Sequence, residues 1–218
     1  MLRTSAPLIG ALGGIPDMVD EFPNDIEQLV HSLAETLTQA WSYHSVLSGL
    51  HVGVNASPLS LTRFPVVLSQ IYLGLIDAMF AKVGTIIDRT GKAQSIPTLL
   101  TKLTKSRDPL LRRLIPDVKL ALNDELGAIK KMERWRHNVV AHKAAMPSDT
   151  SFYADNQMDL KEIEGALTEL EGLINKLSSA VLNLYVNTHT GTNRLHAESI
   201  ELCAFIAKQV EAAPSEKK

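Results

Sequence analysis

Residues 159–184 read DLKEIEGALTELEGLINKLSSAVLNL, and this stretch decides the fold class. Its large apolar residues recur at alternating steps of three and four, which places them on one face of an amphipathic α-helix. They are Leu160, Ile163, Leu167, Leu170, Ile174, Leu177, Val181 and Leu184. Asp159 and Glu162 have the spacing of a capping box at the helix start. The apolar seam can pack inside a bundle or pair with a second chain as a coiled coil, and we favour the intramolecular core.

Helical spacing of apolar residues extends over most of the remaining chain. Asn24 is suited to cap a first helix, and a second, almost wholly apolar helix fits the middle of a bundle. The expected helices span about 24–53, 61–89, 95–103, 109–142, 160–184 and 193–211. The fourth is expected to kink or restart at Pro116 and to stop by Pro147. No strand pattern or internal repeat is visible, so the sequence predicts an all-α bundle of about five to six helices.

The length of 218 residues suits one domain. We expect a loose arm at 1–23, a single helical domain at 24–212 and a disordered tail at 213–218. With 45% hydrophobic and 21% charged residues the chain has ordinary globular composition. The single Cys203 excludes an intramolecular disulfide and fits a reducing compartment.

The charge balance argues against some classes of partner. A formal net charge of −2 creates no global field that would attract nucleic acid or membrane. The most apolar segment, 64–87, carries Asp77 and Lys82, so we expect no membrane span and a cytoplasmic protein. Any binding of a polyanion must come from a local cluster. The loose basic cluster around the short helix is usually just a solvated face, and it is a candidate RNA-tracking surface only if the protein is a nuclease; its members are Lys102, Lys105, Arg107, Arg112 and Arg113.

The densest group of functional side chains is the segment 133–143, which reads ERWRHNVVAHK. Arginine offers a planar set of donors that suits phosphate, and histidine can give or take a proton near neutral pH. On a regular helix Arg136 points along the apolar face and diverges from His142 by about 120°. The two can converge if the helix loosens near His142, or if a homodimer brings two copies together.

The same residues carry a resemblance to a known family. Arg136, the polar His137, four further residues and His142 resemble the Arg-polar-x4-6-His signature of HEPN domains. The earlier run IDAMFAKVGTIIDRTGKAQSIPTLLTKL, at 76–103, is similar to the abortive-infection U branch of these proteins. The resemblance covers about residues 70–143.

This resemblance implies a metal-independent endoribonuclease in phage defence or a toxin-antitoxin pair. Arg136 would hold the scissile phosphate, and His142 would act as general acid or base. His137 and Asn138 would orient phosphate or base, and RNA backbone contacts would come from Arg134 and Lys143. The implied partners are RNA, a second copy of the chain and an antitoxin. No cofactor, metal or DNA is expected.

Two departures from the family pattern keep other interpretations open. The position after the arginine is usually Asn or Asp, and an acidic residue often follows the histidine, where this chain has Ala144 and Ala145. Arg136 could instead be a structural arginine paired with Asp77. The domain would then be a non-catalytic dimeric interaction module or a nucleotide sensor.

A zinc site is the weaker interpretation of the remaining histidines. His189, His196 and Cys203 are spaced by seven, whereas metal ligands on a helix prefer steps of three or four.

Overall fold

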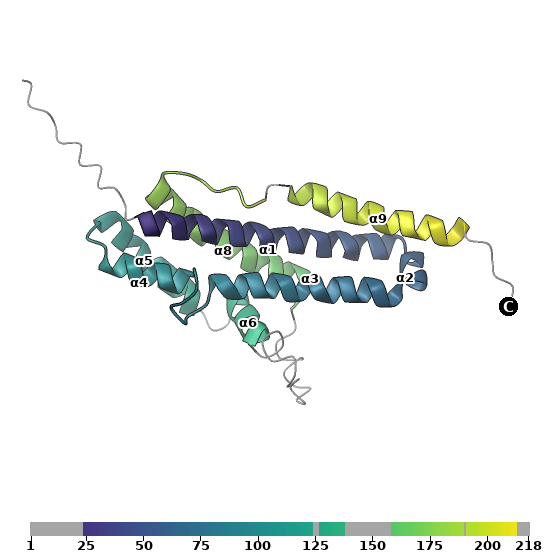
Figure 1. The fold of residues 1–218 in the computed structure, drawn as a ribbon, viewed down its shortest axis with the longest axis horizontal. Helices are drawn as coiled ribbons and strands as arrows, with labels where there is room; N and C mark the ends of the chain where they lie inside the picture. Colours follow the sequence, from purple (N-terminus) through teal and green to yellow (C-terminus); the bar gives the residue numbers. More distant parts are fainter. Residues whose placement is uncertain (1–23, 124–126, 138–157, 190, 213–218) are drawn as a thin grey trace, which may run out of the picture.

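The computed structural model describes residues 24–123, 127–137, 158–189 and 191–212 (Figure 1). This part of the chain is all-α, as predicted, with eight helices and no strand among the described residues. The helices are α1 (Asn24–Ala56), α2 (Leu59–Arg63), α3 (Pro65–Ile86), α4 (Ile96–Lys105), α5 (Pro109–Asn123), α6 (Ala128–Trp135), α8 (Leu160–Leu182) and α9 (Thr192–Ala212).

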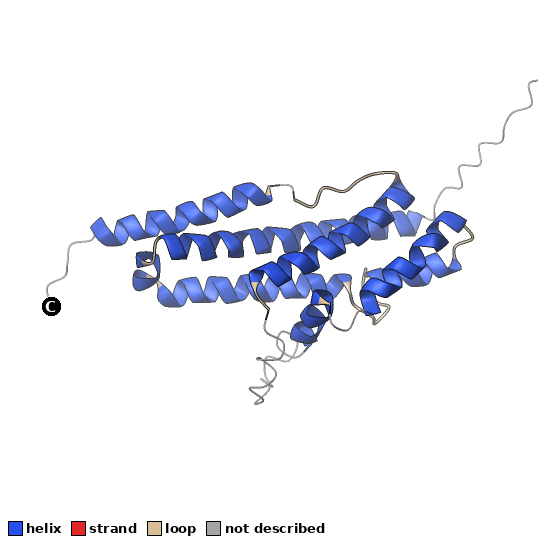
Figure 2. Cartoon of the chain, turned by 180° about the vertical axis from the view of Figure 1, so that it is seen from behind, coloured by secondary structure: helices blue, strands red, loops and turns tan. Residues whose placement is uncertain are grey.

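The long helix α1 is the centre of the arrangement. It packs against α3 and α9 along its length and against α8 on a third side. Figure 1 shows α9 and α3 on opposite sides of α1, and Figure 2, from behind, shows α8 crossing the bundle obliquely. The short helices α4 and α5 form one end of the molecule, near the start of α1.

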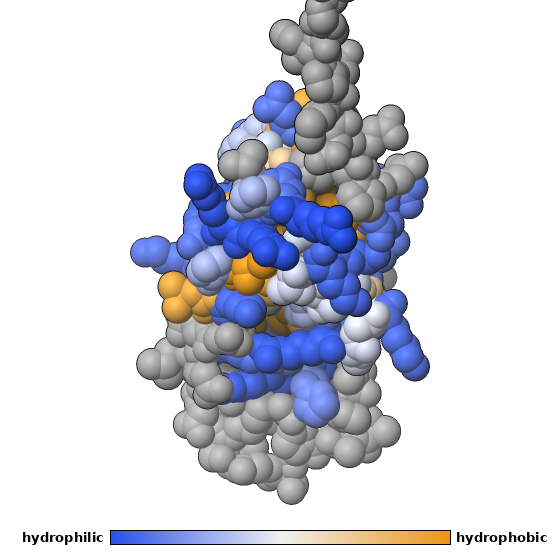
Figure 3. All heavy atoms as spheres, turned by 90° about the vertical axis from the view of Figure 1, so that its left-hand side faces the viewer, coloured by the Kyte–Doolittle hydropathy of each residue, from blue (hydrophilic) through white to orange (hydrophobic). Residues whose placement is uncertain are grey.

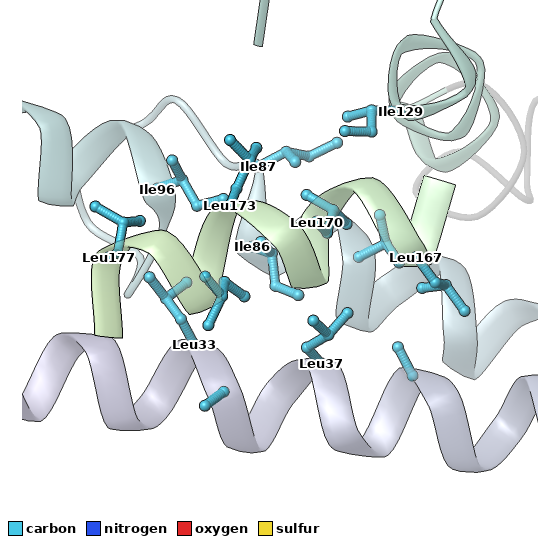
Figure 4. Close-up of a cluster of buried hydrophobic side chains, with 14 of the residues drawn as sticks. Leu33, Leu37, Ile86, Ile87, Ile96, Ile129, Leu167, Leu170, Leu173 and Leu177 are labelled. Atoms are coloured by element: carbon cyan, nitrogen blue, oxygen red, sulfur yellow. The ribbon is translucent and has the colours of Figure 1, made fainter. Parts of the chain in front are cut away.

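The core forms where α8 packs against α1, α5 and α6, and side chains of α3 and α4 complete it. Figure 4 shows Leu167, Leu170, Leu173 and Leu177 of α8 between side chains of α1 and of the other helices. All four are buried, and so are most members of the predicted seam. Two members differ: Leu160 is partly buried, and Leu184 is 57% exposed because α8 ends at Leu182. The seam is therefore intramolecular core from Ile163 to Val181.

The start of α8 has the predicted capping box. The Asp159 carboxylate accepts from the Glu162 backbone N–H at 2.7 Å, and the Glu162 carboxylate accepts from the Asp159 backbone N–H at 3.2 Å. A hydrogen bond and ion pair from Lys131 at 2.6 Å ties Glu162 to α6. Lys131 is the main reason that the pKa of Glu162 lies below its usual value. The start of α8 and the middle of α6 are thus held together.

Two glycines set the distance between α1 and α9. A Cβ on Gly53 would lie 2.8 Å from the Cβ of Cys203, and one on Gly49 would lie 2.7 Å from the Cβ of Ser199. Both distances are shorter than real Cβ contacts. Because the two glycines are four residues apart, they lie on one face of α1, where α9 approaches closely.

Two expected helices are interrupted. The segment predicted as 61–89 divides at Phe64, because Pro65 starts α3 and its ring cannot continue the hydrogen bonds of α2. The segment predicted as 109–142 divides before Ala128, where Gly127 has an extended backbone. Pro116 lies inside α5 without ending it.

The helix α3 differs from its predicted role in the centre of the bundle. By length and composition alone it could cross a membrane, which Asp77 and Lys82 had led us to exclude. Only 22% of its most apolar 18-residue window is buried. Its second half, with Met79, Phe80 and Val83, belongs to the core, whereas its first half is mostly exposed.

Candidate functional site

The predicted site begins on the last turn of α6. Arg134 and His137 are exposed, and the side chain of Arg136 is 37% exposed. Asn138, His142 and Lys143 lie outside the described residues, so the structure gives the arginine half of the signature. The side chain of Arg136 points toward α3, in agreement with its predicted place on the apolar face of the helix.

The helix continues past Trp135 into residues 136 and 137, which have π-helical character. Arg136 keeps right-handed α backbone angles, and its N–H is directed at the carbonyls of Met132 and Glu133. A π-helical turn contains more residues than an α-helical one and is frequent at functional sites. His142 lies outside the described residues, so its divergence from Arg136 and the loosening of the helix near it stay predictions.

A row of residues on α3 receives the end of α6. Phe80, Gly84 and Asp88 are each four residues apart and follow one face of the helix and its C-terminal extension. Phe80 contacts Trp135 with ring centroids 5.9 Å apart. Gly84 lies directly beneath the Arg136 side chain. The burial of Ile129 and Met132 anchors the other end of α6 in the core.

Gly84 provides the space in which Arg136 lies. A Cβ at this position would overlap the Cδ of Arg136 and would lie 2.9 Å from its Cγ. Ordinary van der Waals contact begins at 3.4 Å, so a larger residue would displace the arginine. The missing side chain of Gly84 lets the guanidinium pass across α3 to its carboxylate partner.

That partner is Asp88. Nη2 of Arg136 lies 3.5 Å from Oδ2 of Asp88, whose side chain is 13% exposed. The Thr90 backbone N–H donates to Oδ1 at 2.7 Å, and the Ser95 hydroxyl donates to the Asp88 carbonyl at 2.6 Å. Ser95 also caps α4 by accepting from the Thr98 N–H. The turn between α3 and α4 thus holds the carboxylate in place.

The same contacts keep Asp88 ionised. The Thr90 N–H, and then the charge of Arg136, lower the pKa of the Asp88 carboxyl below its usual value. A guanidinium has five N–H donors, and the ion pair with Asp88 engages Nη2. Within the described part of the chain, Arg136 is therefore oriented by a fixed anion and keeps donors for a second one.

Asp77, the carboxylate predicted for Arg136, is half-buried on α3. Among the described residues the carboxylate paired with Arg136 is Asp88, eleven residues further along. The pairing with Asp77 stays a prediction. Sequence reasoning missed both Gly84 and Asp88, although their spacing of four, in line with Phe80, was a signal that they share a face.

Further charges surround this arrangement, which we call the Arg136 centre (Phe80, Gly84, Asp88, Trp135 and Arg136). Glu133 accepts from Lys130 at 2.6 Å, and it lies 3.5 Å from Nε of Arg89. Arg134 is exposed on the same helix. Three cations (Arg89, Lys130 and Arg136) are thus paired with two carboxylates (Asp88 and Glu133) at this centre.

Basic residues continue from this centre toward α4 and α5. Arg89 and Lys92 are exposed on the turn after α3, and Lys105, Arg107, Arg112 and Arg113 are exposed beyond it. Lys102, a member of the predicted cluster, forms an ion pair with Asp25. Figure 3 shows that this end of the molecule is covered mainly by hydrophilic side chains.

The other predicted histidines lie elsewhere. His44 is buried and forms a hydrogen bond with the Leu160 carbonyl at 3.1 Å. His189 contacts Trp41 and lies 2.9 Å from a Glu171 carboxylate oxygen. Cys203 is buried beneath α1. Within the described ranges, no group of three or more His, Cys, Asp or Glu side chains could hold a metal ion.

Comparison with known protein families identifies the family of this chain. A HEPN family model described as AbiU2 matches residues 23–202. This chain belongs to the AbiU2 family of HEPN domains. The match extends well beyond the residues 70–143 that carried the resemblance in the sequence, and it includes α1, α8 and part of α9. No curated protein and no solved structure matches the chain.

The Arg136 centre lies within the segment that matches the family. In this AbiU2 domain Arg136, the arginine of the predicted signature, lies on Gly84 and is paired with Asp88. Its position is therefore set by α3 and by the turn that follows α3, both far from the signature in sequence.

Proposed function

We propose that this AbiU2 domain is a metal-independent endoribonuclease of phage defence or of a toxin-antitoxin pair. The observation that supports the proposal is the Arg136 centre, where a partly exposed arginine side chain lies on Gly84, is paired with Asp88 and has the basic residues Arg89 and Lys130 nearby. Arg136 binds the scissile phosphate and stabilises the charge that develops on it. The RNA, like most polyanions, is attracted by the surrounding cations.

In this proposal His142 carries out the proton transfer. The ribose 2′-oxygen attacks the phosphorus, the bond to the 5′-oxygen breaks, and the products are a 2′,3′-cyclic phosphate and a 5′-hydroxyl. His142 either removes the proton of the 2′-hydroxyl or donates one to the leaving oxygen. His137 and Asn138 orient phosphate or base. Arg134 and Lys143 contact the backbone of the RNA.

The RNA continues along the basic residues that lead to α4 and α5. Arg89 and Lys92 follow the Arg136 centre, and Arg107 and Arg112 extend the path. Because these contacts are to phosphates, binding weakens steeply as salt is raised. The active form is a homodimer in the cytoplasm, and an antitoxin is its natural inhibitor.

The ion pair of Arg136 supports a second candidate. A guanidinium already neutralised by Asp88 is also what a structural arginine requires, since a partly buried charge needs a partner. In that case the domain is a non-catalytic module that binds a partner protein or senses a nucleotide.

The deciding experiment is RNA cleavage in excess EDTA. Wild type is compared with Arg136→Ala and His142→Ala, and with Arg194→Ala, an exposed arginine on α9 whose ion pair is with Glu198. We expect cleavage with cyclic phosphate ends by wild type and by Arg194→Ala only. If none of the folded proteins cleaves RNA, the nuclease proposal is wrong and the non-catalytic module is favoured. Nucleotide-dependent thermal stabilisation would then identify a sensor.

A further inference from the structure

A hollow of about 1110 Å³ lies between α5, α8 and the segment that follows α8. One wall belongs to a single face of α8, because its residues are spaced by three or four. They are Thr168, Gly172, Asn175, Ser179 and, just after the helix, Asn183. Arg113 and Leu114 of α5 form the opposite wall, and Tyr185 lies at the end. We call this space the α5–α8 hollow. It lies at the end of the molecule where α1 begins (Figure 1).

The segment after α8 is fixed against the helix by side-chain contacts. Oδ1 of Asn175 accepts from the Val186 N–H at 2.9 Å, and the Ser178 hydroxyl donates to the Leu184 carbonyl at 2.9 Å. Tyr185 lies between these two contacts and is 75% exposed. A fixed backbone therefore presents its ring, which reduces the conformational entropy that a ligand must remove on binding.

Asn175 brings hydrogen-bond donors to the hollow. The residue is 7% exposed, and its Oδ1 is occupied by the Val186 N–H. An amide nitrogen carries two donors, and within the described part of the chain Nδ2 of Asn175 donates to no protein group. Nor is Nδ2 sealed in the core: among the described residues the fully buried side-chain atom without a partner is Nε1 of Trp41. These donors are therefore available to an acceptor on a ligand.

Two cations lie at the rim of the hollow. Arg113 is exposed and forms no ion pair with a described residue. Nζ of Lys176 lies 3.3 Å from Oδ2 of Asp117, and both side chains are more than half exposed. A surface ion pair of this kind contributes little to stability, so Lys176 can turn to another anion. The carboxylate of the hollow, Glu171, is engaged by His189 at 2.9 Å.

We propose that the α5–α8 hollow binds one nucleotide, with its phosphate on Arg113 and Lys176 and its base on the ring of Tyr185. The amide N–H groups of Asn175 donate to an acceptor on the edge of the base. Proteins recognise unpaired nucleotides by this combination of aromatic stacking, hydrogen bonds to base edges and contacts to phosphate. The nucleotide belongs to an unpaired stretch of RNA or is a free mononucleotide, since both present the same base and phosphate.

Other ligands fit this hollow less well. An acyl chain requires an apolar wall, whereas Thr168, Ser179 and Asn183 line this one. A phosphate alone would leave the Tyr185 ring and the Asn175 donors unused.

The RNA form of this inference rests on the proposed function, to which it adds recognition of a base. Arg113 follows Arg112, which lies on the proposed path of the RNA. The contact of α8 with α6 is at Glu162, about 20 Å along α8 from Asn175 at 1.5 Å per residue. The hollow is therefore separate from the Arg136 centre, and it selects RNA through a nucleotide outside the cleaved bond.

The test measures binding in the absence of cleavage. One set of probes consists of AMP, CMP, GMP, UMP and inorganic phosphate, whose binding is measured by calorimetry. The other consists of fluorescent RNA strands of about ten nucleotides, measured by anisotropy. The 2′-hydroxyls of these strands are methylated, so the attacking group of the proposed reaction is missing.

The variants separate the three contacts. Tyr185→Ala removes the ring, and Tyr185→Phe keeps it. Asn175→Asp removes the donors and keeps an acceptor for the Val186 N–H. Arg113→Ala removes a phosphate contact, and its matched control is Lys119→Ala, an exposed lysine of α5 that does not line the hollow. Circular dichroism verifies that all the proteins are folded.

We expect wild type, Tyr185→Phe and Lys119→Ala to bind the strands equally well. Tyr185→Ala should weaken binding about 5- to 150-fold through the loss of stacking, and Asn175→Asp at least about 5-fold. Arg113→Ala should also reduce the slope of log affinity against log salt by about 0.7, the value for one phosphate of a single strand. Tyr185→Ala should leave this slope unchanged, and so would loss of an arginine that is only structural.

Three results would each overturn the inference. They are a wild type that binds no nucleotide probe, Tyr185→Ala and Asn175→Asp variants that bind as tightly as the controls, and phosphate that binds as tightly as the mononucleotides. Variants that lose affinity for mononucleotides but not for strands would assign the site to a free nucleotide. RNA cleavage is assayed on the same proteins. Binding at the hollow without cleavage contradicts the nuclease proposal alone, and cleavage with unchanged binding by the hollow variants contradicts this inference alone.

Discussion

Replacement of Gly84 by alanine is expected to push Arg136 away from Asp88. The added Cβ would overlap Cδ of Arg136, and the surrounding helices α3 and α6 are fixed by the Phe80–Trp135 contact and by the buried Met132. Overpacking of this kind costs about 1–3 kcal/mol. Alanine in a helix is favoured over glycine by about 0.5–1 kcal/mol, which offsets part of that cost.

The net expectation is a loss of about 0–2.5 kcal/mol in the free energy of unfolding, which corresponds to a lowering of Tm by up to about 10 °C for a domain of this size. Gly74→Ala is the matched control on the same helix, because Gly74 has no neighbour within 4 Å of an added Cβ. It should stabilise the protein by about 0.5–1 kcal/mol. Thermal and urea unfolding followed by circular dichroism measure both changes.

A double-mutant cycle shows whether Arg136 is the cause. In an Arg136→Ala background the overlap is removed, so Gly84→Ala should become neutral or stabilising. The coupling between the two substitutions is then about 1–3 kcal/mol. If Gly84→Ala stabilises the wild-type protein as much as Gly74→Ala does, Arg136 does not lie on Gly84 and the reasoning is refuted.

Two further predictions concern the charge of Asp88 and the contact of α1 with α9. The folded-state pKa of Asp88 is lowered, so its ionised carboxylate contributes to the free energy of unfolding. This contribution is present above the unfolded-state pKa of about 3.9 and is lost as the pH falls through the folded-state pKa. The free energy of unfolding of Asp88→Asn, measured in urea, should therefore be lower than that of wild type by about 1 kcal/mol from pH 5 to 8. This difference should disappear below about pH 4, and a difference that grows in acid would contradict the prediction. Gly53→Ala should destabilise the protein by about 1–3 kcal/mol, because the added Cβ would overlap Cys203. Gly172→Ala is the control and should not destabilise it, because an added Cβ there has no neighbour within 4 Å. Equal Tm values for the two variants would show that α9 does not pack on Gly53.

The sequence by itself determined the fold class and most of the helices. The seam of α8 and its capping box depend on residues within three or four positions of each other, so the periodicity is visible without any knowledge of the partner helices. The signature around Arg136 was also visible, because its residues lie within one short segment. The breaks at Pro65 and Gly127 were missed because apolar spacing continues across both positions.

Only the tertiary structure decided what surrounds the signature. Asp88 and Arg136 are 48 positions apart, and their contact depends on the angle and separation at which α6 crosses α3. Gly84 is important for the same reason, since nothing in its neighbourhood along the chain indicates that an arginine will lie on it. Likewise, the apolar spacing of α3 predicted a central helix, whereas packing buried its second half and exposed its first. Local periodicity gives the face of a helix, but the number of neighbouring helices that cover that face is set by the whole chain.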